Sequence, residues 1–241
     1  ACYMEITNQN MKTLDIPRLV RDIGLSQGIG EKLKLGSYRY AAQENQIKAS
    51  ITVKKMELPA YDPRGAYGMA LGYVMSTRGG CHLRAYPISH EILRKPVATD
   101  RFTFSGKARV IKIAEDLNAM VDSLTACKFI FFAATLEEYA RAIYGVTGMQ
   151  TNGQDLKKIG ERIYYNDRIM NSINGFTIDD DDLPERFFKE HGSSGNGIDV
   201  KPLCRKDFEQ ARLNYYKIRG LDTYGKPTIE KAKELGLEWK N

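Results

Sequence analysis

Glycine concentrates between residues 57 and 86, in the stretch ELPAYDPRGAYGMALGYVMSTRGGCHLRAY. Each glycine inside a helix destabilises it by about 1 kcal/mol relative to alanine, so close packing or a closely approaching ligand must offset that cost. In the helix predicted over residues 66–76, Gly68, Gly72 and Ser76 recur every four residues and form a stripe with almost no side-chain bulk. We expect this stripe to face another backbone or a flat cofactor.

Helical patterns account for most of the remaining sequence. The predicted N-caps are Asp15, Ser105, Thr135, Asn152 and Thr228, and the predicted C-terminal glycines are Gly24, Gly175 and Gly220. The longest predicted helix starts at Asn152, and its predicted face comprises Leu156, Ile159, Ile163, Asn166 or Asp167, and Met170. Only residues 47–53, IKASITV, alternate as a half-buried strand would. The predicted fold class is therefore mainly α: multihelical, with at most a short β segment near residues 47–54.

The domain organisation follows less directly from the sequence. We expect residues 1–241 to form one multihelical region, with a division into two helical subdomains near residues 100–130. Residues 1–14 show no periodicity and no helix start signal before Asp15. We therefore expect an artificial or split start at residue 1.

Composition and charge exclude several classes of function. The formal net charge is +6, but Lys and Arg are scattered among Asp and Glu instead of forming the basic stripe of a nucleic-acid-binding protein. No stretch of eighteen apolar residues and no signal peptide is visible, so we expect a cytoplasmic protein without a membrane span. The four cysteines form no Cys-x-x-Cys pair, which argues against a disulfide framework and a self-contained metal site.

His82 and Tyr61 are the candidates for chemistry within the glycine-rich stretch. An imidazole donates or accepts a proton near neutral pH, although a histidine bonded to a backbone carbonyl is the simpler interpretation of His82. Tyr61 precedes Asp62-Pro63-Arg64, which predicts a rigid loop. Arg64 could brace Asp62 or hold an anionic ligand, and we favour bracing. The same two interpretations apply to Arg84.

Two further groups of residues need a similar comparison. Cys127 follows a predicted helix end and is the cysteine we favour for metal ligation, although a lone cysteine is more often a core residue. The four aspartates at residues 179–182 lack the alternating spacing, the glycine and the final glutamate of a calcium loop. We predict a solvated turn there.

Three motifs together carry a resemblance to a known family. ELPAYDPRG, GGCHLRAY and the segment Asp122-Ser123-Leu124-Thr125-Ala126-Cys127-Lys128 resemble the carboxy-terminal part of the aldehyde ferredoxin oxidoreductases, which are tungsten-pterin enzymes. The later segments ERIYYNDRIMNSINGFTIDDDDLPERF and YYKIRGLDTYGKPTIEKAKELGLE agree with it, so the resemblance extends from about residue 16 onward.

The resemblance implies a tungsten ion held by two pterins beside a [4Fe-4S] cluster, in an enzyme that oxidises aldehydes to carboxylic acids. It implies that His82 is the active-site histidine and that Tyr61 lies in the substrate pocket. The implied cofactor-binding residues are Arg84, Asp122, Ala126, Cys127 and Lys128. Cys127 would be the fourth ligand of the cluster. The glycine stripe would then form a wall against a pterin, with Tyr61 and His82 facing one pocket.

This sequence departs from the family pattern in two places. In the family motif Asp-x-x-Gly-Leu-Cys, the glycine and leucine are replaced here by Thr125 and Ala126. The amino-terminal pterin-binding domain, its Cys-x-x-Cys-x-x-x-Cys ligands and its glutamate base are absent from these 241 residues, so one thiolate cannot complete a cluster. The resemblance therefore implies an amino-terminal portion or subunit as a partner.

The sequence thus predicts part of a tungsten-pterin, iron–sulfur oxidoreductase. It would act on a small aldehyde and pass electrons to ferredoxin or to an iron–sulfur electron-transfer subunit. One alternative is an aromatic acyl-CoA reductase of the same family. The other is a truncated chain that serves as a non-catalytic structural module.

Overall fold

The computed structural model describes residues 1–239, apart from the side chains of residues 131 and 132. Helices dominate the described part, and the only strands within it are β1 (Thr52–Val53) and β2 (Met56–Glu57). The prediction of a mainly α, multihelical fold is confirmed. None of the helices in residues 1–239 combines the length and apolar character that a membrane crossing requires.

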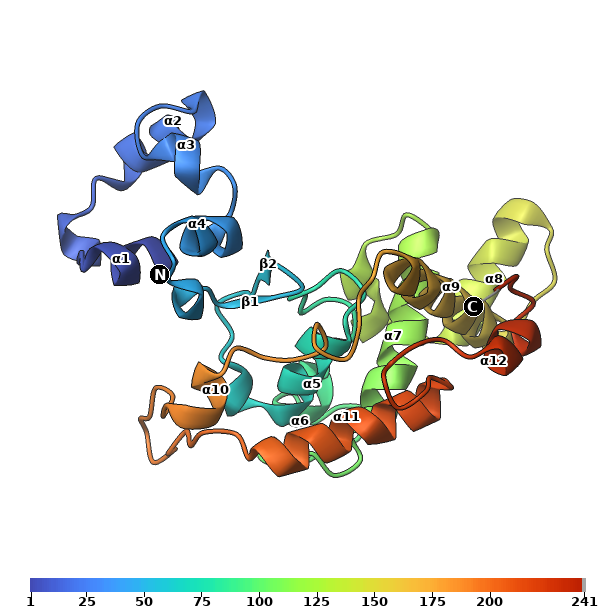
Figure 1. Cartoon of the computed structure of the whole chain (residues 1–241). Coiled ribbons are helices and arrows are strands. Elements are labelled where there is room, and N and C mark those ends of the chain that lie inside the picture. The colour runs from blue at the N-terminus through green and yellow to red at the C-terminus, as the bar shows by residue number, and fades with distance from the viewer. Residues whose placement is uncertain (240–241) are drawn as a thin grey trace.

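The first four helices form a small unit at one end of the molecule (Figure 1). They are α1 (Cys2–Thr7), α2 (Ile16–Leu25), α3 (Gly30–Leu33) and α4 (Ser37–Gln43). As predicted, Asp15 caps α2, because its carboxylate accepts from the backbone N–H of Arg18. The predicted stop at Gly24 is wrong, because Ser26 adopts the left-handed conformation, at φ 55°, and ends the helix there.

The strand predicted over residues 47–53 is only partly correct. Residues Ile47–Ala49 form a 3₁₀ turn, and β1 pairs with β2 in an antiparallel hairpin. Lys54 and Lys55 make the tight turn between the strands with positive φ angles of 49° and 64°. Pairing is limited to two residues on each strand, and a strand persists only where a partner satisfies its backbone groups.

Helix α5 (Tyr67–Met75) confirms the helix predicted over residues 66–76, but its small-residue stripe contacts the chain itself. A Cβ added at Gly68 would lie 2.9 Å from the Glu91 carboxylate. A Cβ at Gly72 would lie 3.5 Å from Ala85 and Ile111. The expectation that this stripe forms a wall against a pterin is therefore wrong, because neighbouring side chains already fill that space.

Seven further α-helices follow α5 within residues 1–239. They are α6 (Ile88–Glu91), α7 (Lys107–Ser123), α8 (Leu136–Thr147), α9 (Gly153–Ile173), α10 (Arg186–Lys189), α11 (Arg205–Arg219) and α12 (Ile229–Glu234). The predicted caps Thr135, Asn152 and Thr228 and the predicted C-terminal glycines Gly175 and Gly220 are confirmed. Ser105 is not the cap of α7: it bonds back to Thr103 in a turn, and Gly106 takes the capping position.

The buried face of α9 differs from the predicted one. Leu156 is buried, but Ile159 and Met170 are 39% and 50% exposed. The other buried residues of this helix are Gly153, Gly160, Tyr164, Tyr165, Arg168 and Ile169. This face packs against α7, and its polar atoms find partners inside: the Tyr164 hydroxyl lies 2.7 Å from Glu115. Hydrophobic periodicity alone misses a face built from tyrosine and arginine.

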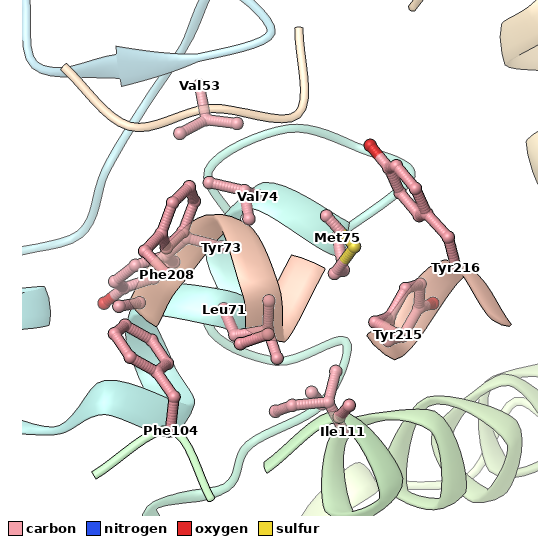
Figure 2. Close-up of a cluster of buried hydrophobic side chains, with 14 of the residues drawn as sticks. Val53, Leu71, Tyr73, Val74, Met75, Phe104, Ile111, Phe208, Tyr215 and Tyr216 are labelled. Carbon is pink, nitrogen blue, oxygen red and sulfur yellow. The ribbon is translucent and has the colours of Figure 1, made fainter. Parts of the chain in front are cut away.

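The main core surrounds α5, as Figure 2 shows. Leu71, Tyr73, Val74 and Met75 of α5 meet side chains from the hairpin, α7 and α11, including Val53, Ile111, Phe208, Tyr215 and Tyr216. A second cluster joins α7, α8 and α9 through Met120, Val121, Tyr139, Ala140, Ile143 and Leu156. Because α7 contributes to both clusters, it crosses the predicted boundary near residues 100–130. The division into two subdomains stays a prediction.

The turn at residues 179–182 is present, but it is not solvated throughout. Asp181 is fully buried, with its carboxylate 2.6 Å from Lys54 and 2.8 Å from Arg168. Burial raises the pKa of Asp181, but these two cations outweigh burial and hold its pKa at about 2. The prediction of a solvated turn is therefore wrong for this residue.

Candidate functional site

Tyr61 and His82 lie side by side, with ring centroids 5.4 Å apart. Tyr61 belongs to the loop before the 3₁₀ turn Pro63–Gly65. Asp62 makes this loop rigid by accepting from the backbone N–H of Arg64 and pairing with its guanidinium at 2.7 Å. Bracing of Asp62 by Arg64 is thus confirmed.

The glycine pair before His82 lets the chain pass tightly against the hairpin. Gly79 has a φ of 99°, and a Cβ there would lie 2.6 Å from the Val53 carbonyl oxygen. A Cβ at Gly80 would lie 2.9 Å from the Met56 carbonyl oxygen. The backbone N–H of Gly80 donates to the Val53 carbonyl at 3.2 Å. Side chains at these positions would push the segment away and displace His82.

The surroundings of His82 favour its neutral form. The ring is half-buried, between Tyr61 and Tyr86, whose ring centroid lies 6.3 Å away. Burial lowers the pKa of His82, and the positive charges of Lys128 and Arg78 lower it further. A neutral imidazole can accept a proton at one ring nitrogen while it donates from the other. Tyr61 is 58% exposed, so its hydroxyl is accessible beside that ring.

An ion network lies next to the segment that carries His82, and it consists of Arg84, Asp122 and Lys128. The Lys128 ammonium lies 2.9 Å from the Asp122 carboxylate and donates to the Leu83 carbonyl at 3.0 Å. The Arg84 guanidinium lies 3.9 Å from Asp122. Lys128 is thus bonded to the residue next to His82. Burial lowers the pKa of Lys128, although Asp122 acts in the opposite direction.

Ala126 and Cys127 connect this network to η4, the 3₁₀ helix Lys128–Phe132. Ala126 is half-buried and packs against the second hydrophobic cluster, whereas Cys127 is exposed at the start of η4. Thr125 has a φ of 53°, in the left-handed region that glycine adopts without strain. The backbone of the Asp122–Cys127 segment therefore takes a conformation suited to the glycine that the family motif has at this position.

The donor set of this surface suits an anionic group. Two cationic side chains, Arg84 and Lys128, lie there, and the buried Arg84 Nε has no hydrogen-bond acceptor within the described part of the chain. Residues 1–239 contain no group of three or more His, Cys, Asp or Glu side chains placed to hold a metal ion. A metal cluster at Cys127 would therefore need ligands from outside these residues.

Two further residues reach this site without a signal in the sequence. Asp167, on α9, accepts from Arg84 at 3.0 Å, and Asn118, on α7, donates to the Arg84 carbonyl at 3.0 Å. Asp167 belongs to the helical pattern of residues 152–174, but its distance to Arg84 depends on the packing of α9. Arg78 also escapes sequence reasoning, because only the fold relates it to His82.

Known proteins resemble this chain over most of its length. The tungsten-containing aldehyde ferredoxin oxidoreductase of Pyrococcus furiosus is 38% identical over 224 residues, and that of Thermococcus kodakarensis is 36% identical over 224 residues. Each alignment covers 90% of this chain and 36% of the relative. The chain therefore spans about a third of the length of these relatives.

A solved structure shares the fold. The active site complex BamBC of benzoyl coenzyme A reductase, in complex with 1,5-dienoyl-CoA, superposes with a TM-score of 0.67 at 18% identity. The superposition covers 91% of this chain and 38% of that one. At this level of identity the likeness concerns the fold alone.

The sequence also matches a family model. The model describes domains 2 and 3 of aldehyde ferredoxin oxidoreductase, and the match covers residues 4–237. Nearly the whole chain is included, which agrees with the order of the motifs around Tyr61, His82 and Cys127. The chain therefore belongs to the aldehyde ferredoxin oxidoreductase family.

Proposed function

We propose that this chain is the carboxy-terminal part of a cytoplasmic tungsten-pterin, iron–sulfur enzyme that oxidises small aldehydes to carboxylic acids. An amino-terminal pterin-binding portion or subunit would complete the site, and ferredoxin or an iron–sulfur subunit would receive the electrons. The observation that supports this proposal most strongly is the Tyr61–His82 pair next to the ion network of Arg84, Asp122 and Lys128, in a chain of this family.

The residues of this surface fit an anionic pterin cofactor. The Arg84 guanidinium and the Lys128 ammonium would supply positive charge, while Asp122 and the backbone at Ala126 would border the same group. Cys127 would contribute one thiolate to a [4Fe-4S] cluster whose other ligands come from the amino-terminal portion. When bound, a tungsten bis-pterin group supplies the two-electron chemistry.

The chain's own residues would orient the substrate and handle a proton. The Tyr61 hydroxyl is accessible and would donate a hydrogen bond to the aldehyde oxygen. His82 is kept neutral by burial and by its cationic neighbours, so a ring nitrogen would accept a proton at neutral pH. Their separation of 5.4 Å allows both side chains to contact one small substrate.

Replacing His82 tests this proposal in the assembled enzyme. We expect His82→Ala to lower kcat/KM for aldehyde oxidation by about 100- to 10,000-fold, the range that loss of a general acid–base residue gives. Tungsten and iron content should stay unchanged, because His82 is not among the residues assigned to the cofactors. The control is His191→Ala, since His191 is an exposed surface residue. A wild-type rate in His82→Ala would refute the role.

The alternative activity is the reduction of an aromatic acyl-CoA thioester. The fold shared with the benzoyl coenzyme A reductase complex favours it, whereas the identity of 36–38% with aldehyde ferredoxin oxidoreductases favours aldehydes. Assays of the purified assembly with both substrate classes distinguish the two. The other alternative is a non-catalytic structural module. Metal analysis of the assembly, together with mass spectrometry of the associated chains, tests it. Absence of tungsten, iron and a partner chain would support it.

A further inference from the structure

Helix α9 holds the segment that carries His82, through two residues one turn apart. The Asp167 carboxylate accepts from the Arg84 guanidinium at 3.0 Å and from the Thr77 hydroxyl at 3.1 Å. Asn171 donates to the Thr77 carbonyl at 2.9 Å. Residues four positions apart lie on one face of a helix, so α9 bonds to residues on both sides of His82.

The position of the Arg84 guanidinium depends on Asp167. One guanidinium nitrogen, Nη2, lies 3.0 Å from Asp167, while Nη1 lies 3.9 Å from Asp122. Lys128 already pairs with Asp122 at 2.9 Å. Without the Asp167 carboxylate, the strongest remaining anionic partner of Arg84 would be Asp122, and Arg84 would compete there with Lys128. The ion network of Arg84, Asp122 and Lys128 would then rearrange.

We propose that Asp167 is a positioning residue of the candidate site. It fixes Thr77 and Arg84 on either side of His82 and holds the Arg84 guanidinium back from Asp122, which stays paired with Lys128. The catalytic consequence of this inference rests on the proposed function, but the effect on residues 77–84 does not. Asp167 acts through Arg84 and Thr77, to which it is bonded.

The test uses Asp167→Asn in the assembled protein, with hydrogen exchange of the segment 77–84 as the first readout. A neutral amide cannot keep the charge pair with Arg84, and its oxygen accepts more weakly from Arg84 and Thr77, so we expect amide exchange there to rise about tenfold. The kcat/KM for aldehyde should fall about 10- to 100-fold, the scale of a misplaced catalytic group. Most of the loss should appear in kcat, and tungsten content should also fall.

Two further variants separate positioning from general damage. Asp167→Glu keeps the carboxylate and should restore slow exchange, tungsten content and most of kcat. Asp182→Asn breaks another arginine–carboxylate pair, Asp182 with Arg205 at 2.7 Å, and the two aspartates are similarly exposed, at 31% for Asp182 and 33% for Asp167. This control should leave exchange in residues 77–84, tungsten content and kcat unchanged.

The outcomes are distinct. Exchange in Asp167→Asn equal to that of the Asp182→Asn control would overturn the inference, as would faster exchange with unchanged tungsten content and kcat. If the wild-type assembly oxidised no aldehyde, the proposed function would fail. Exchange and tungsten content would still decide whether Asp167 positions this segment.

Discussion

At the scale of single residues, the charge state of His82 depends on its surroundings. Burial and the positive charges of Lys128 and Arg78 lower its pKa below the ordinary value, so the imidazole is neutral at pH 7. In the proposed role of proton acceptor, it would be active only when neutral. Activity should therefore rise with pH through the lowered pKa of His82 and level off above it.

Removing one of these charges should shift that dependence. In Arg78→Gln a cation near His82 is lost, so the imidazolium becomes easier to form and the pKa rises. We expect the acidic limb of the pH profile of kcat/KM to move to higher pH. Salt should move the wild-type profile in the same direction, because it screens exposed charges.

The control for this measurement is Arg109→Gln, another exposed arginine, in the first turn of α7. It should leave the profile in place. A profile that moved to lower pH in Arg78→Gln, or that moved equally in both variants, would contradict the electrostatic account.

At the scale of elements, α7 and α9 make the most extensive helix contact within residues 1–239. A Cβ added at Gly160 would overlap the Asp116 carbonyl oxygen of α7, which is backbone and cannot move aside alone. We expect Gly160→Ala to lower the free energy of unfolding by about 1–3 kcal/mol, because overpacking forces the helices apart. Urea denaturation measures this change.

Gly145→Ala in α8 is a matched comparison. An added Cβ there meets nothing within 4 Å, and the residue is helical. This substitution should raise the free energy of unfolding by about 0.5–1 kcal/mol, since alanine is the better helix former. Equal effects in the two variants would show that contact with α7 is not what requires glycine at residue 160.

Helix boundaries were predictable where the signal is local. The capping box of Thr135 and Glu138 needs only residues three positions apart, and it forms as predicted. The buried face of α9 was not predictable, because Tyr164 is buried through its bond to Glu115, 49 positions away in sequence. The strand at residues 47–53 was overestimated because its pairing partner ends after two residues.

The residues of the candidate site likewise divide into those that the sequence predicted and those that only the fold reveals. The resemblance to a family led to Tyr61 and His82, and their rings are adjacent in the fold. Asp167 reaches Arg84 across 83 positions of sequence, so no local pattern could reveal it. The prediction that the glycine stripe faces a cofactor failed for a related reason. Gly68 leaves room for Glu91, whose carboxylate occupies the place expected for a ligand.

At the scale of the whole molecule, Asp181 joins elements distant in sequence. Its carboxylate contacts Lys54 in the hairpin turn, Arg168 on α9 and the Tyr216 hydroxyl of α11. We expect Asp181→Asn to lower the free energy of unfolding at pH 7 by about 3–5 kcal/mol, because two buried cations lose their counter-charge. Asp179→Asn, at an exposed position, should change it by less than about 0.5 kcal/mol.

Acid should weaken the wild-type protein through the same residue. The pKa of Asp181 falls from 3.8 to about 2 on folding, so its stabilising effect is complete above pH 3.8 and is lost as the pH falls toward 2. This loss amounts to about 2 kcal/mol. Between pH 5 and pH 2, the free energy of unfolding should therefore fall less steeply in Asp181→Asn than in the wild type. Denaturation curves recorded at several pH values measure this difference. An identical pH dependence in the two proteins would refute this.

The three hydrophobic clusters are not equally connected to one another. The smallest one, Cys2, Tyr40, Ala41 and Ala49, shares no residue with the other two, whereas α7 belongs to both of those. Opening the first fifty residues would expose little apolar surface. Loosening α7 would disturb both larger clusters at once, together with Asp122 at its end. Fluctuations of α7 should thus reach the candidate site through both large clusters, whereas the blue end of Figure 1 is linked to the rest of the chain by polar contacts such as Ser37 with Glu57 and Glu5 with Arg186.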